Sequence, residues 1–234
     1  MTPAQISAWP GKSIDGHTHP ALWHMLDVGA VATCLIKRRT LTGSRQADQA
    51  ASLLVTLHDL GKFSASFRAM LLGRPYTGFR HWQHSYRLLR DHDNWLSGRL
   101  GATPSIRSLL YAAVAGHHGG PPEHLDDRKS RDQAHQIGAE ATVIAGKAIK
   151  AVAPLFPGAS LNGVTESEAR RLSWALCGLT VQADWIGSNS EWFRPQDSET
   201  QLRLSPIGKM PFSGQKPRSP GPDCIARGHR PTDP

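Results

Sequence analysis

The stretch Leu57-His58-Asp59-Leu60-Gly61-Lys62 places an adjacent imidazole and carboxylate at the end of an apolar segment. The preceding residues 53–55 are Leu, Leu and Val, which predicts a helix over 46–60 that ends at Gly61. A His-Asp pair alone often arises by chance, so its context carries the signal. A second pair, His92-Asp93, lies in a polar stretch, and we expect a solvated surface pair there.

Hydrophobic spacings of three and four recur along the chain and predict further helices. Ser130 with Gln133 and Thr165 with Glu168 fit the capping box, in which side chains satisfy the free N–H groups of a helix start. The expected helices cover 22–38, 46–60, 63–72, 81–92, 105–118, 130–155 and 165–193. No segment alternates convincingly with period two. The sequence therefore predicts an all-α helical bundle.

The last part of the chain differs in composition from the rest. Residues 195–234 hold 8 prolines of the chain's 17. Such a stretch has few core-forming side chains to offset the entropy lost on ordering. We expect one domain over residues 1–194, followed by a disordered or irregular tail or linker over 195–234.

Composition points to a cytoplasmic protein with a polyanionic partner. No apolar run approaches the ~20 residues of a membrane helix, and the N-terminus shows no secretory signal. Cys34, Cys177 and Cys224 form neither a disulfide framework nor a metal knuckle. The net charge of +8 suits nucleic acid, because Lys and Arg displace counterions from phosphates. The 12 histidines suggest metal binding.

Further metal-ligand residues lie in or beside the predicted helices: His24, His84, the pair His117-His118, and Asp184. Each alone has an ordinary structural explanation, such as a hydrogen-bonded core side chain. With His58 and Asp59 they make a set whose members would each lose roughly 1–3 kcal/mol if buried without a partner. A shared metal centre removes that cost. Carboxylate oxygens can bridge two cations, and two cations can clamp a phosphodiester during its displacement.

The order His, His-Asp-x-Gly-Lys, His, His-His, Asp resembles the HD phosphohydrolase superfamily. Four segments are more narrowly similar to the HD nuclease domain of the type I CRISPR-associated helicase-nuclease: His24-Met25-Leu26-Asp27-Val28, His58-Asp59-Leu60-Gly61-Lys62, His117-His118-Gly119-Gly120 and Gln182-Ala183-Asp184-Trp185-Ile186-Gly187-Ser188. The similarity spans about residues 13–193. The tail does not share it, and no helicase segment is part of this sequence.

The resemblance implies a ligand set for two divalent metals. His24, His58, Asp59 and Asp184 surround one ion, while Asp59, His84, His117 and His118 hold the other, so that Asp59 bridges them. Asp59 and Lys62 are the expected catalytic residues, with Lys62 stabilising charge on the phosphate. A solvated lysine at a helix end is the alternative for Lys62. Ser188 lies on the helical face of Asp184 and is a weaker candidate for substrate contact.

Imidazole-rich ligands favour iron, manganese, cobalt or nickel over magnesium. The resemblance implies a nuclease for single-stranded DNA in CRISPR antiviral defence, with a helicase domain and the RNA-guided surveillance complex Cascade as partners. Two alternatives remain open: an HD phosphohydrolase for a nucleotide or cyclic nucleotide, and a non-catalytic DNA-binding or adaptor fragment.

We expect the remaining histidines to lie outside the centre. His17 and His19 are predicted in a loop near the mouth of the site, and His81, His124, His135 and His229 are expected to have no catalytic role. Most tryptophans are expected in the core, although Trp82 or Trp185 would suit a groove where a base stacks.

Overall fold

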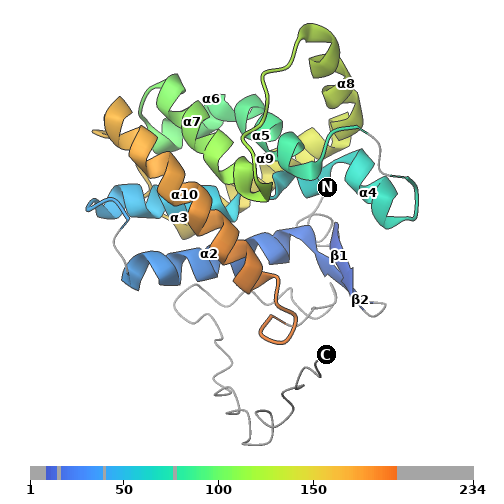
Figure 1. Ribbon diagram of the computed structural model, residues 1–234, viewed down its shortest axis with the longest axis horizontal. Coiled ribbons are helices and arrows are strands. Elements are labelled where there is room, and N and C mark those ends of the chain that lie inside the picture. Colours follow the sequence, from blue (N-terminus) through green and yellow to red (C-terminus); the bar gives the residue numbers. More distant parts are fainter. Residues whose placement is uncertain (1–8, 15–16, 39–40, 76–77, 194–234) are drawn as a thin grey trace, which may run out of the picture. The chain divides into compact units, whose positions relative to one another are not determined.

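The computed structural model describes residues 9–14, 17–38, 41–75 and 78–193 (Figure 1). The tail predicted over 195–234 lies outside the described residues. The elements in chain order are β1 (Pro10–Ile14), β2 (His17–Pro20), α2 (Ala21–Arg38), α3 (Arg45–Thr56), η1 (Leu60–Phe63), α4 (Ala65–Leu71), α5 (His81–Asp91), α6 (Asp93–Leu100), α7 (Pro104–Ala115), η2 (Gly116–His118), α8 (Asp127–Ile137), α9 (Ala139–Val152), η3 (Ala153–Leu155) and α10 (Glu166–Gly187).

The predicted all-α architecture is confirmed, with helices packed around one apolar core. Helix α10 contacts α7 and α2, and α2 in turn packs along α3 (Figure 1). The core includes Leu54 of α3, Leu110 of α7 and Leu176 of α10, all fully buried. The side chains at 53–55 that suggested a buried helix are each inaccessible to solvent. The His-Asp pair therefore lies just after a fully buried helix segment.

One small sheet was not predicted. Strands β1 and β2 form an antiparallel hairpin in which Lys12 pairs with His19. The hairpin is held by Trp9, whose Nε1–H donates to the carbonyl of Lys62 at 3.2 Å and whose ring packs edge-on against Phe63. It lies close to the start of α2 because Gly11 has no side chain: a Cβ there would lie 2.6 Å from the Cα of Ala21. Tertiary contacts, rather than alternating hydrophobicity, form these strands.

The expected helix over 46–60 is shorter than predicted. Helix α3 ends at Thr56, and residues 60–63 form the 3₁₀ turn η1. Gly61 does not stop a helix as expected; it is buried within η1. A Cβ on Gly61 would lie 1.8 Å from the carbonyl oxygen of His81, so only glycine permits the first turn of α5 to approach this closely. The N–H of Gly61 also donates to Ser85 Oγ at 2.9 Å.

The single helix expected over 130–155 is two helices. Gly138, with φ of 81°, separates α8 from α9. Asp126 caps the start of α8, where its side chain accepts the N–H of Lys129, so the predicted capping box at Ser130 is wrong. The second predicted capping box is confirmed, because Thr165 and Glu168 make both reciprocal hydrogen bonds at the start of α10.

The pair His92-Asp93 is not a solvated surface pair as expected. Asp93 accepts two hydrogen bonds of 2.7 Å from the Arg107 guanidinium and a third, of 2.8 Å, from the hydroxyl of Tyr111. His92 Nε2 lies 3.0 Å from the carbonyl of Thr142, to which it donates. The pair begins a helix, α6, that was not predicted, and it ties α6 to α7 and α9.

Among the residues that the structure describes, no helix combines the length and the apolarity that a membrane span requires.

Candidate metal centre

Metal-ligand side chains converge where the ends of several helices meet. These side chains form two groups, and within each group the ligand atoms all lie within 4.8 Å of one another. The aspartate group consists of His24, His58, Asp59 and Asp184. The histidine group consists of His81, His117 and His118. The segments that supply them are α2, the turn after α3, α5, η2 and α10.

The aspartate group is compact and buried. His24 Nε2 lies 3.2 Å from Asp59 Oδ2 and 3.2 Å from Asp184 Oδ1. His58 Nε2 lies 3.3 Å and 3.6 Å from the same two oxygens. Both imidazoles are fully buried, whereas the Asp184 side chain retains 17% exposure. The structure thus brings together all four residues that were expected around one ion.

The histidine group faces the other oxygen of Asp59. His81 Nε2 lies 3.4 Å and His117 Nε2 lies 3.7 Å from Asp59 Oδ1. His118, which is exposed, lies with its Nε2 3.0 Å from His81 Nε2. The carboxylate of Asp59 therefore stands between the two groups, with Oδ2 toward one and Oδ1 toward the other.

Several buried polar atoms in the centre lack a hydrogen-bond partner within the described protein: His24 Nε2, His58 Nε2, His117 Nε2 and Asp59 Oδ1. The Nδ1–H groups of His58 and His117 donate to the carbonyls of Val55 and Val114, which directs each Nε2 into the centre. Buried polar atoms without a partner cost roughly 1–3 kcal/mol each, and a coordinated cation removes the cost. The residues present fit divalent metal ions.

His84 was expected in the second ligand set, but it lies outside both groups. It is fully buried, and its Nε2 lies 3.1 Å from Ser66 Oγ. His81, which was expected to have no catalytic role, is the histidine of α5 that lies in the histidine group. The two residues are three apart on α5 and share one side of the helix, so spacing alone does not separate them. The missed signal is a position at a helix terminus: His81 begins α5, His58 follows α3, and His117 and His118 follow α7.

Close approach of neighbouring elements brings the ligands together. Because Gly61 has no side chain, the first turn of α5, which carries His81, packs directly against it. Gly187 does the same for α10, since a Cβ there would lie 2.8 Å from Val28 Cγ2 on α2. This contact sets Asp184 of α10 beside His24 of α2.

Lys62 contacts the centre as predicted from the motif. Its Nζ lies 2.6 Å from Asp59 Oδ2, and its side chain is only 12% exposed. Burial alone would raise the pKa of Asp59, but Lys62 and His58 hold that pKa well below its usual range. The pKa of Asp184 is also lowered, against the effect of burial, by the imidazoles of His24 and His58. Both carboxylates are therefore ionised at neutral pH.

The imidazoles differ in their affinity for protons. Burial lowers the pKa of His81 to about 4 and that of His117 to about 3. Burial also acts to lower the pKa of His58, but the carboxylate of Asp59 raises it to about 9. Metal ligation needs neutral imidazoles. In the metal-free protein His81 and His117 already meet that requirement, while His58 must release a proton.

Other residues singled out from the sequence lie around the centre. Ser188 Oγ lies 3.1 Å from Asp184 Oδ1. His19 is not in a loop: it lies in β2, is buried, and has its Nε2 3.1 Å from Asp27 Oδ2. Trp185, next to Asp184, is 77% exposed. The expectation that most tryptophans are core residues is wrong, since Trp95, Trp174 and Trp192 are exposed as well.

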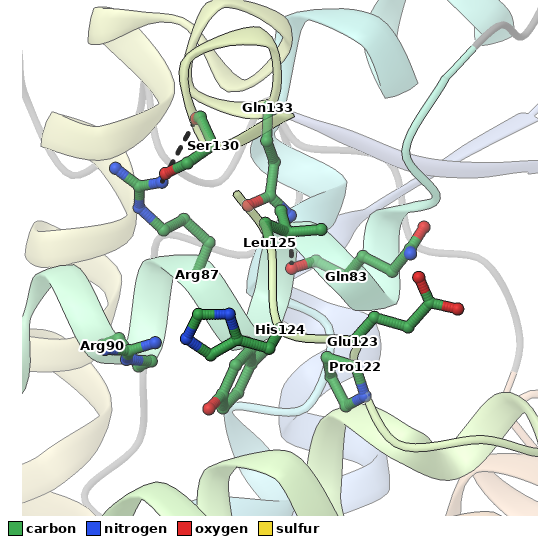
Figure 2. A pocket seen from close by; sticks show the side chains of 10 residues that line it. Gln83, Arg87, Arg90, Pro122, Glu123, His124, Leu125, Ser130 and Gln133 are labelled. Atoms are coloured by element: carbon green, nitrogen blue, oxygen red, sulfur yellow. Dashed lines mark hydrogen bonds between the residues drawn. The ribbon is translucent and has the colours of Figure 1, made fainter. Parts of the chain in front are cut away.

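A separate hollow of about 180 Å³ lies on the other side of α5, formed with α8 and the segment after η2. Figure 2 shows Arg87 bonded to Ser130 and Gln133 bonded to Gln83 within it. None of its lining residues belongs to the aspartate group or the histidine group. This hollow is therefore distinct from the candidate metal centre.

Several solved structures have a similar fold. A CRISPR-associated protein is 27% identical, with a TM-score of 0.62 over 84% of this chain and 24% of its own. The Thermus thermophilus cas3 HD domain, crystallised in the presence of Ni²⁺, is 24% identical, with a TM-score of 0.63 over 83% of this chain and 81% of its own. T. fusca Cas3 with ATP is 20% identical, with a TM-score of 0.62 over 80% of this chain and 23% of its own.

This chain spans about a quarter of the length of the first of these relatives. No curated protein matches the sequence. The sequence model of the family described as "Cas3, HD domain" matches residues 9–193, which include both groups of the candidate metal centre. On the fold, the site and this match, the chain belongs to the Cas3 HD-domain family.

Proposed function

We propose that this chain is a metal-dependent nuclease that hydrolyses phosphodiester bonds of single-stranded DNA in CRISPR defence. The observation that carries the proposal is the position of Asp59. Its Oδ2 lies near the imidazoles of the aspartate group, and its Oδ1 lies near the histidine group. A carboxylate so placed is suited to bridge two cations.

The ligand assignment follows the geometry. His24, His58, Asp59 and Asp184 hold one ion, and Asp59, His81, His117 and His118 hold the other. His81 replaces His84 in the set expected from the sequence. Five imidazoles and two carboxylates favour first-row transition ions, namely iron, manganese, cobalt or nickel, over magnesium, which prefers oxygen ligands.

Two bound ions would stabilise the negative charge that develops on a phosphodiester during displacement. The protein's own part is to hold and orient. The His58 and His117 rings are fixed by their hydrogen bonds to backbone carbonyls. The ammonium of Lys62 lies beside Asp59 and, on this proposal, also contacts the substrate phosphate. His118 is exposed and Asp184 partly so, which marks the side from which a phosphate reaches the centre.

Single-stranded DNA is the substrate that these features favour. The chain carries a net charge of +8, which suits a polyanion. Exposed Trp185 adjoins Asp184, where its ring can stack on a base. The described residues contain no motor that separates strands, so we propose a helicase domain and the Cascade complex as partners.

The test is to incubate the protein with Mn²⁺ and a circular single-stranded DNA, beside the same circle made double-stranded. We expect the single strand to be nicked at least tenfold faster, because a centre at the ends of buried helices needs an exposed phosphate. Equal rates on the two circles would contradict the substrate assignment.

The same assay separates the alternatives. A nucleotide phosphohydrolase would leave the circle intact and release phosphate or a monophosphate from nucleoside triphosphates or cyclic mononucleotides. A non-catalytic DNA-binding fragment would shift the circle in a gel without cutting it at any Mn²⁺ concentration. Either outcome would replace the nuclease proposal.

A further inference from the structure

Lys12, on the hairpin strand β1, reaches the rim of the metal centre from a distant part of the sequence. Its Nζ donates to the carbonyl oxygen of Ser188 at 3.0 Å. The hydroxyl of the same Ser188 lies 3.1 Å from Asp184 Oδ1, in the aspartate group. The ammonium of Lys12 is thus connected through one residue to a proposed metal ligand.

Lys12 lies within electrostatic range of Lys62, the other lysine of the centre. Lys62, Asp27 and Asp184 all act electrostatically on its ammonium. Burial and the neighbouring Lys62 charge lower the pKa of Lys12. Two ammonium groups therefore act on each other electrostatically at the rim of a site that fits two divalent cations. Such an accumulation of positive charge calls for an anion.

Lys12 and Lys62 differ in their own partners. Lys62 Nζ lies 2.6 Å from Asp59 Oδ2, so it is already neutralised by a carboxylate. No carboxylate of the described residues lies in ion-pair contact with Lys12. An ammonium has three N–H donors, and the carbonyl of Ser188 uses one of them. Among the described residues no further acceptor bonds the Lys12 ammonium, so its other donors can serve a ligand.

We propose that Lys12 is a substrate-binding residue whose ammonium binds a phosphate of the DNA strand next to the metal centre. The proposal rests on the proposed nuclease function, and it adds a phosphate contact that the His-Asp motif does not contain. The hairpin holds the contact in place. Trp9 anchors β1 to the Lys62 carbonyl, and Gly11 seats it against α2.

The main competing role is mechanical. The Lys12–Ser188 hydrogen bond also ties the hairpin to the end of α10, and a tether alone would explain the contact. A tether predicts lost stability without a change in phosphate binding. A phosphate contact predicts a change in the salt dependence of DNA binding, because each contact releases counterions.

The experiment compares the full chain with its Lys12→Gln, Lys12→Arg and Lys150→Gln variants. Lys150, an exposed lysine of α9 outside both groups, is the matched charge control. Binding of a thymidylate 12-mer is measured with chelator present, so that no cleavage is needed, over a series of salt concentrations. KM and kcat for cleavage are then measured with Mn²⁺, and melting temperatures are recorded.

We expect Lys12→Gln to weaken binding of the 12-mer roughly three- to tenfold and to reduce the slope of log K against log salt by about 0.7, the value for one phosphate of a single strand. KM should rise more than kcat falls. Lys12→Arg should keep the slope, and Lys150→Gln should keep both slope and KM.

An unchanged slope in Lys12→Gln, with or without a lower melting temperature, would overturn the phosphate contact and leave the tether. A loss in Lys12→Arg equal to that in Lys12→Gln would overturn it too, since the charge would then not matter. Failure of the wild-type protein to cleave would instead contradict the proposed function. It would leave the test of Lys12 intact, because the binding series does not depend on cleavage.

Discussion

At the scale of single residues, the centre depends on one carboxylate. Asp59 contacts His24, His58 and Lys62 through Oδ2, and His81 and His117 through Oδ1. A neutral side chain of the same size cannot offset the repulsion between two cations. Asp59 is therefore the residue whose charge the whole arrangement requires.

The contrast between His81 and His84 gives a prediction on metal content. Replacing His81 with Ala removes a ligand of the histidine group, so we expect the metal bound after Mn²⁺ reconstitution to fall from two ions to about one per chain. His84→Ala should retain both ions, because His84 Nε2 contacts Ser66 Oγ and neither group. Elemental analysis of the two variants measures the difference.

His84→Ala also tests the structural role of that residue. It leaves a cavity where a fully buried imidazole packed, which should lower the free energy of unfolding by about 1–3 kcal/mol. If His84→Ala lost an ion while His81→Ala kept both, the ligand set would return to the one expected from the sequence.

At the scale of elements, close approach of η1 to α5 positions the histidine group. In Gly61→Ala the new Cβ would lie 1.8 Å from the His81 carbonyl, so α5 must shift. We expect a loss of about 2–4 kcal/mol in stability, by analogy with overpacking, and weaker binding of the second ion. Thermal unfolding and Mn²⁺ titration report the two effects.

Gly98→Ala is the matched control for Gly61→Ala. Gly98 lies within α6, and a Cβ there has nothing within 4 Å. Alanine is the better helix former by about 0.5–1 kcal/mol, so this variant should be as stable as wild type or more so. Equal stability of the two variants would contradict the packing role of Gly61.

The ion pair between Asp93 of α6 and Arg107 of α7 predicts a pH dependence of stability. Hydrogen bonds from the Arg107 guanidinium lower the pKa of Asp93, against the effect of burial. Because the folded-state pKa is depressed, the stabilisation is present above the unfolded value of about 3.9 and is lost as pH falls through the folded pKa. Asp93→Asn should cost roughly 1–3 kcal/mol at pH 7.

Urea unfolding at pH 7 and near pH 3 checks this prediction. The gap between wild type and Asp93→Asn should narrow at the lower pH. Asp91→Asn is the control, because Asp91 pairs with Arg87 on the surface and should contribute about 0.5 kcal/mol or less. A difference in free energy of unfolding that stays constant with pH would mean that the Asp93 charge does not stabilise the contact between α6 and α7.

Hydrophobic spacing predicted the long helices but not what joins them. Periodicity found α2, α5, α7 and α10 because their buried faces repeat every three or four residues. It could not find the hairpin, which depends on Trp9 and Gly11 meeting distant residues. It also merged α8 with α9, since the break at Gly138 comes from one backbone angle. Contacts between segments far apart in sequence decide these features.

At the scale of the whole molecule, the sequence pointed to six of the seven residues that the structure brings into the two groups, and it did not point to His81. His24, His58, Asp59, Asp184, His117 and His118 all fall in the two groups. The position of His81, rather than His84, in the histidine group depends on how α5 packs on η1, which no local pattern records.

The net charge of +8 also acts at the scale of the whole molecule. Affinity for a polyanion comes from dispersed Lys and Arg side chains, so it should survive the loss of one buried carboxylate. Binding and cleavage are therefore expected to separate in a variant that damages the metal centre alone. Asp59→Ala is that variant.

The most direct test is nicking of a circular single-stranded DNA by wild type and Asp59→Ala with Mn²⁺, run beside a gel-shift assay and a check of folding by circular dichroism. We predict that wild type nicks the circle, and that Asp59→Ala folds, binds the DNA within about threefold of wild type and does not nick it. Nicking at the wild-type rate by a folded Asp59→Ala protein would contradict the metal-bridge role of Asp59 and the nuclease account built on it.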